Sequence, residues 1–146
     1  MHFITGGAFN GKAKWVRSFY KIKERQDVIW ISAYKHQALP MMLHDFGKDL
    51  VVLEGAEQWV REISVRSDLK GFREEWKNVL RNWHLWEKES PERILVIIGA
   101  DITKGIVPVK KEHRNWRDCT GWAFQDIVGL ADRVDLIWYG IGQRLK

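Results

Sequence analysis

The sequence predicts an α/β fold, with a mostly parallel sheet of about five or more strands flanked by helices. Short apolar runs alternate with amphipathic helical patterns along the chain, and this alternation is typical of strand–helix–strand units. The runs are continuously apolar, as expected of strands covered on both faces. A glycine-rich turn that ends in lysine joins the first run to the first helical pattern, which indicates a phosphate-binding arrangement.

Five segments are expected in the first half of the chain. They are a strand at 2–5, a helix from Lys12 to about Lys23, a strand at 28–31, a loop with a short helical turn at 34–49, and a strand at 50–53. The helix is predicted because apolar residues share one helical face; they are Trp15, Val16, Phe19 and Tyr20. Pro40 and Gly47 leave the fourth segment without a regular period.

The second half continues the alternation. Its expected elements are a helical region from Ala56 to about Glu87 that Gly71 divides, a strand at 94–98, a helix from about His113 to Asp132, and a strand at 134–139. The second part of the helical region has the clearest apolar stripe, formed by Phe72, Trp76, Val79, Leu80 and Trp83. Gly140 and Gly142 then turn the chain toward a basic end.

The glycine-rich turn fits the phosphate-binding loop G-x-x-x-x-G-K of P-loop nucleotide-binding proteins. Gly6, Gly11 and Lys12 occupy its fixed positions. Glycines let successive backbone N–H groups point at one phosphate, and the lysine and the helix N-terminus add positive charge beside the β- and γ-phosphates. The predicted nucleotide-binding residues of the loop are Gly6, Gly7, Ala8, Phe9, Asn10, Gly11, Lys12 and Ala13.

Polar residues also follow the other predicted strands. Ligands of open parallel sheets bind beyond the carboxyl ends of the strands, so we expect further nucleotide contacts from Ser32, Ala33, Tyr34 and Glu54. Glu54 is the candidate Mg²⁺ ligand. Asp101 follows the fourth predicted strand at the same edge, where it either joins the site or caps a helix or turn. The predicted catalytic set is Lys12, Glu54 and Asp101.

Composition narrows the class of protein. A chain of 146 residues is expected to form one P-loop domain over 1–146. Neither an apolar run of membrane-spanning length nor a signal-peptide pattern is found. Basic and acidic residues are interspersed within a net charge of +5, which favours a solvated surface and ranks nucleic-acid binding last. The single Cys119 suits a reducing cytosol. Most of the nine tryptophans are expected in the core, with a subset free for a subunit partner or a large flat ligand.

At both ends the sequence resembles the adenosylcobinamide kinase / adenosylcobinamide-phosphate guanylyltransferase family. The opening Ile4-Thr5-Gly6-Gly7-Ala8 with Gly11-Lys12 is similar to the family's T-G-G-A-x-x-G-K loop. The family's later pattern G-I-V-P…R-D…G…Q…A-D…G-x-G is matched without a gap by Gly105-Ile106-Val107-Pro108, Arg117-Asp118, Gly121, Gln125, Ala131-Asp132 and Gly140-Ile141-Gly142. The chain resembles a shortened and divergent member.

The resemblance implies a cytoplasmic enzyme of cobalamin biosynthesis or salvage with two activities. A kinase step transfers the γ-phosphate of ATP or GTP to the aminopropanol hydroxyl of adenosylcobinamide. A second step uses GTP, through a guanylylated histidine, to make adenosyl-GDP-cobinamide. The implied cofactor is Mg²⁺, and the implied partners are a nucleoside triphosphate and the corrinoid. Asp101 stands where a similar family segment has an acidic residue, which implies that it orients the acceptor hydroxyl or a metal-bound water. Similar proteins are homo-oligomers, often trimers. The sequence leaves the choice between ATP and GTP open.

Two features depart from the family. Ala13 replaces the Ser or Thr that follows the loop lysine and holds Mg²⁺, which leaves Glu54 as the candidate ligand. The connection between the second and third strands is short and lacks the family's H-x-x-x-R-P motif, so His36 and His44 are the remaining candidates for a covalent histidine. These departures keep an alternative open, a nucleotide-binding protein that has lost catalysis and serves a regulatory or assembly role.

Overall fold

A six-stranded sheet forms the centre of the computed structural model, which describes residues 1–146. The strands are β1 (His2–Thr5), β2 (Val28–Ser32), β3 (Leu50–Glu54), β4 (Ile94–Ile98), β5 (Arg133–Trp138) and β6 (Ile141–Arg144). Their order across the sheet is β2-β3-β4-β1-β5-β6. All neighbouring pairs are parallel except β5 and β6, which are antiparallel. The predicted α/β fold with a mostly parallel sheet is confirmed.

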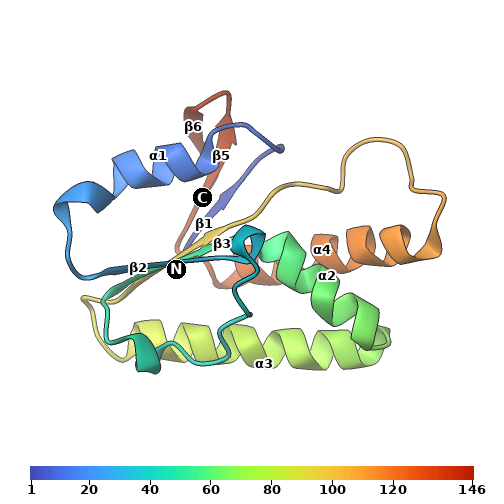
Figure 1. Ribbon diagram of the computed structural model, residues 1–146, viewed down its shortest axis with the longest axis horizontal. Helices are drawn as coiled ribbons and strands as arrows, with labels where there is room; N and C mark the ends of the chain where they lie inside the picture. Colours follow the sequence, from blue (N-terminus) through green and yellow to red (C-terminus); the bar gives the residue numbers. More distant parts are fainter.

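Four helices cover the sheet unequally. α1 (Lys12–Phe19) lies on one face, and the other face carries α2 (Ala56–Arg66), α3 (Leu69–Lys88) and α4 (Lys111–Leu130) (Figure 1). The larger apolar core lies under the three helices, where four tryptophans are fully buried: Trp59, Trp76, Trp83 and Trp86. The smaller core packs around Val16 of α1. None of these helices has the length and apolar content needed to cross a bilayer.

Two predicted helix boundaries are wrong. α1 ends at Phe19 because Lys21 takes a left-handed conformation with φ of 49°, which a continuing helix does not allow. The long helical region divides at Asp68 instead of Gly71. The Asp68 side chain accepts a hydrogen bond from the Gly71 backbone N–H at 2.8 Å and so caps α3. Gly71 therefore lies inside the first turn of α3.

The edges of the sheet also differ from the sequence-based expectation. β2 is an edge strand, and its first three residues are only partly buried. At the other edge β6 was not predicted, because its four residues are all exposed and give no apolar period. The loop between β2 and β3 contains two short 3₁₀ turns, Ala33–Lys35 and His44–Phe46.

The register places four strand ends at one level. Ser32 of β2 lies opposite Glu54 of β3, and Glu54 lies opposite Ile98 of β4. Ile98 in turn pairs with Ile4 of β1. The segments that follow these strands therefore meet at one edge of the sheet, as the sequence predicts.

Candidate nucleotide-binding site

The glycine-rich loop links β1 to α1 as the motif requires. Gly6 has φ of 141°, and a Cβ atom there would lie 2.2 Å from the carbonyl oxygen of Ile137 in β5. Gly11 has φ of 84° and immediately precedes α1. Only glycine adopts both conformations without strain. The loop is thus shaped by its glycines to curl over the N-terminus of α1.

Lys12 lies inside this curl. Its Nζ donates hydrogen bonds to the carbonyl oxygens of Gly6 at 3.1 Å and Gly7 at 2.7 Å, and the side chain is buried. Burial lowers the pKa of Lys12, while the carboxylates of Glu57, Glu54 and Asp101 act in the opposite direction. The ammonium is therefore held among loop carbonyls and faces a group of acidic side chains.

The turn between β5 and β6 holds the glycine-rich loop through two hydrogen bonds to Asn10. The backbone N–H of Gly140 donates to the carbonyl oxygen of Asn10 at 2.8 Å, and the N–H of Tyr139 donates to Asn10 Oδ1 at 3.3 Å. A Cβ atom on Gly142 would lie 2.6 Å from Nε1 of Trp15. The G-x-G motif near the end of the chain therefore positions the glycine-rich loop and lets α1 pack closely.

A cavity of about 520 Å³ opens beside the loop. It brings together most of the predicted nucleotide-binding residues, namely Ala8 to Ala13, Tyr34 and Glu54. Ser32 and Ala33 are buried and do not line it. Ala100 and Ile102 form part of the wall contributed by the segment after β4.

Asp101 is close to the loop but is engaged locally. Its backbone N–H donates to the carbonyl oxygen of Gly6 at 3.0 Å. Its Oδ1 accepts hydrogen bonds from Thr103, at 3.0 Å from the backbone N–H and 2.6 Å from the hydroxyl. Lys104 Nζ lies 3.7 Å from Oδ2. Asp101 thus caps the turn after β4, one of the two roles considered for it from sequence.

Glu57 is a site residue that sequence reasoning missed. It is 1% exposed, and its carboxylate accepts hydrogen bonds from the Tyr34 hydroxyl at Oε1 and from the backbone N–H of Ala100 at Oε2, the latter at 2.8 Å. Burial, and then this hydrogen bond to Glu57, raise the pKa of Tyr34. The signal in the sequence is a glutamate in the first turn of α2, on its buried face and three positions after Glu54.

Glu54 has the chemistry that a Mg²⁺ ligand needs. Its Oε2 accepts a hydrogen bond from Nε1 of Trp30 at 2.9 Å, and the side chain lines the cavity. Mg²⁺ in nucleotide sites uses one or two carboxylates together with phosphate oxygens and water. No cluster of three or more potential metal-binding side chains is present, and Ala13 has no oxygen to offer. The residues present therefore fit a metal that arrives with the nucleotide.

The two candidate histidines lie in different places. His36 is exposed, has φ of 57°, and lines a neighbouring cavity rather than the loop cavity. His44 lies near the opposite edge of the sheet, before β3 begins, and its Nε2 is 2.7 Å from Glu89 Oε2. The structure brings neither imidazole into the cavity beside Lys12.

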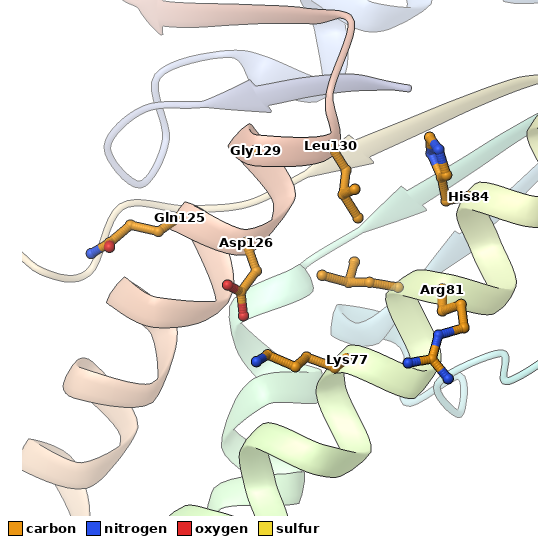
Figure 2. Close-up of a pocket in the computed structure, with 8 residues that line it drawn as sticks. Lys77, Arg81, His84, Gln125, Asp126, Gly129 and Leu130 are labelled. Atoms are coloured by element: carbon orange, nitrogen blue, oxygen red, sulfur yellow. The ribbon is translucent and has the colours of Figure 1, made fainter.

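Another cavity, of about 450 Å³, lies between α3 and α4. Figure 2 shows Lys77 of α3 directed toward Asp126 of α4. The residues that line it include none that the sequence predicts for the site and none that line the loop cavity. We therefore place the candidate nucleotide site at the loop cavity.

Comparison with known proteins gives one family match. Residues 21–145 match the family described as cobinamide kinase / cobinamide phosphate guanyltransferase. This match begins after the glycine-rich loop, so the loop is identified by its sequence motif and its geometry. A search of curated proteins gives no match.

Proposed function

Because the chain belongs to the cobinamide kinase / cobinamide phosphate guanyltransferase family of cobalamin biosynthesis, we propose that it transfers the γ-phosphate of a nucleoside triphosphate to the aminopropanol hydroxyl of adenosylcobinamide. One observation carries this proposal. Lys12 is buried within a glycine-shaped loop and lies beside a cavity that Glu54 also lines. Phosphoryl transfer asks mainly for positioning and for neutralisation of charge, and these residues supply both.

In the proposed reaction, the loop N–H groups and the N-terminus of α1 bind the β- and γ-phosphates. Lys12 exchanges its hydrogen bonds to Gly6 and Gly7 for bonds to phosphate oxygens. Its positive charge then lies where negative charge develops during transfer. The hydrogen bond from the Gly140 N–H to the Asn10 carbonyl oxygen supports the curled form of the loop, and a loop held in this form needs little reorganisation to bind phosphate.

The carboxylates take complementary roles. Glu54 would hold Mg²⁺, which supplies charge neutralisation at the phosphate oxygens. Thr103 hydrogen-bonds to Oδ1 of Asp101, whereas Oδ2 has only the Lys104 ammonium nearby, at 3.7 Å, so Oδ2 is the oxygen that would accept a hydrogen bond from the acceptor hydroxyl. Such a bond would orient the hydroxyl toward the γ-phosphate.

Turnover of adenosylcobinamide tests the proposal directly. The protein is incubated with the corrinoid, Mg²⁺ and either ATP or GTP, and the products are resolved by mass. We expect phosphorylated corrinoid, and we expect Lys12→Ala to slow its formation by about 10²–10³-fold, the usual effect of removing one transition-state donor. A Lys12→Ala protein as fast as the unsubstituted protein would refute the proposal. Nucleotide binding without any product would favour the non-catalytic alternative, which Ala13 supports by removing a usual metal ligand.

Guanylyl transfer is a second candidate activity. His36 is favoured over His44 as the covalent residue because it is exposed beside the loop cavity, whereas His44 is paired with Glu89. Intact mass after incubation with GTP tests this activity. A GMP adduct that His36→Asn abolishes would support it, and turnover without any adduct would exclude a covalent route.

We further propose a cytoplasmic location and a homo-oligomer, as the resemblance implies. A cluster of exposed apolar side chains near the β5–β6 turn supports an interface between copies. It comprises Trp138, Tyr139 and Ile141.

A further inference from the structure

A second cavity adjoins the nucleotide cavity. Its volume is about 650 Å³, and residues of the turn after β2 and of α2 form most of its lining. Tyr34 and Gln58 line both cavities. A molecule bound in one cavity is therefore adjacent to a molecule bound in the other, which is the arrangement that direct transfer between two substrates requires.

The polar lining of this second cavity suits a ligand rich in amides. His36 and Arg61 provide N–H donors, and Glu62 and Glu112 provide carboxylate oxygens. Primary amides donate and accept hydrogen bonds, so a mixed lining matches them. A polyanion such as a second nucleotide would instead meet two carboxylates. The lining thus distinguishes this cavity from the phosphate-binding one.

One cation of this lining is held in place. The Arg61 guanidinium lies 5.0 Å from the centroid of the Trp116 ring, and its Nη2 is 3.6 Å from Glu112 Oε1. The Tyr34 ring and Val65 are 51% and 62% exposed and supply apolar surface for a flat ring. The corrin ring of adenosylcobinamide is flat and carries primary amides along its edge.

We infer that this second cavity binds the corrinoid acceptor, with its amide-bearing edge against Arg61 and Glu62 and its hydroxyl arm passing Tyr34 and Gln58 toward the γ-phosphate. The inference rests on the proposed kinase function and extends it, because it assigns acceptor selection to residues outside the glycine-rich loop.

Corrinoid and nucleotide affinities of two variants test the inference. Val65→Trp fills the cavity, and Arg61→Gln removes its anchored cation. Leu85→Trp and Arg81→Gln are matched controls on α3, where both side chains are exposed and neither lines the two cavities. Adenosylcobinamide binding is measured by equilibrium dialysis with detection by its visible absorbance, nucleotide binding is measured separately, and turnover is measured in parallel.

We expect Val65→Trp and Arg61→Gln to weaken adenosylcobinamide binding about tenfold or more, as overpacking and loss of a charged partner do. Nucleotide affinity should change less than about twofold, and the controls should change neither affinity. Unchanged corrinoid affinity in both variants would overturn the inference, as would absence of corrinoid binding to the unsubstituted protein. Corrinoid binding that depends on this cavity, without phosphorylated product, would support the inference and refute the kinase proposal.

Discussion

The Glu57 carboxylate is a buried acceptor shared by two donors, and a double-mutant cycle tests that arrangement. Tyr34 donates to one carboxylate oxygen and the Ala100 backbone N–H to the other. In Glu57→Gln the side-chain amide offers only one oxygen. The amide of the variant turns its oxygen to the buried Ala100 N–H and its NH₂ group to Tyr34, whose hydroxyl then accepts instead of donating, so two hydrogen bonds to a carboxylate become two weaker neutral ones.

The expected cost follows from this geometry. A hydrogen bond to a charged group contributes about 1.5–3 kcal/mol and a neutral one about 0.5–1.5 kcal/mol, so replacing two of the former by two of the latter in Glu57→Gln should destabilise the fold by about 1–3 kcal/mol. Tyr34→Phe removes one hydrogen bond from a half-exposed side chain and should cost about 1 kcal/mol. In the double variant residue 34 has no hydroxyl, so exchanging the carboxylate for an amide weakens only the bond from the Ala100 N–H. The two changes should therefore cost about 1 kcal/mol less together than the sum of the single costs.

Urea unfolding of the four proteins measures these values, provided that the dependence on denaturant is the same in all of them. Thermal midpoints offer a second readout, with about 2–4 °C expected for each kcal/mol in a chain of this size. Additive effects of the two substitutions would refute the shared-acceptor reasoning. A Glu57→Gln protein as stable as the unsubstituted one would refute it as well.

Three further predictions concern the packing, acid stability and assembly of the chain. Gly142→Ala brings a Cβ atom to about 2.6 Å from the Trp15 indole. It should lower the free energy of unfolding, measured in urea, by about 1–3 kcal/mol. An unchanged midpoint would contradict the close packing of α1 against this glycine. Burial lowers the pKa of His2 below its ordinary 6.5. As the pH falls through that value, the unfolded chain therefore binds more protons than the folded chain, and the free energy of unfolding should decrease below about pH 6.5. A flat stability between pH 7 and 5 would contradict this His2 prediction. The pKa of Asp135 is also lowered from 3.8; burial acts to raise it, but the hydrogen bonds from Arg133 and His2 outweigh burial. The contribution of Asp135 to the free energy of unfolding should therefore be lost only at still lower pH. Trp138→Ser removes a side chain that is 66% exposed from the apolar cluster near the β5–β6 turn. Light scattering during size exclusion should report a smaller mass than that of the unsubstituted protein, which we propose to be a homo-oligomer, and equal masses would contradict an interface at this cluster.

Local patterns in the sequence predicted most of the fold. Continuous apolar runs located the five parallel strands, because a strand covered on both faces must be apolar at every position. The glycine-rich loop was predicted at Gly6 to Lys12 because its backbone conformations and its lysine are specified within a few residues. The helix boundary at Asp68 was not predicted. Glycine is a poor helix former, which favoured a break at Gly71, whereas in the structure the Asp68 carboxylate accepts a hydrogen bond from the Gly71 N–H and starts α3 before it. β6 gave no pattern because its side chains are exposed.

Contacts between distant parts of the chain could not be predicted in this way. Glu57 and Ala100 are separated by 43 positions, and Asn10 and Tyr139 by 129. No local period reports such pairs, because they depend on strand order and on which loops meet at one edge of the sheet. The sequence by itself thus determined the strands, the loop chemistry and the family resemblance. Only the tertiary structure decided that Glu57 joins the site, that the turn after β5 supports the loop, and that a second cavity adjoins the first, because each depends on segments that the sheet brings together.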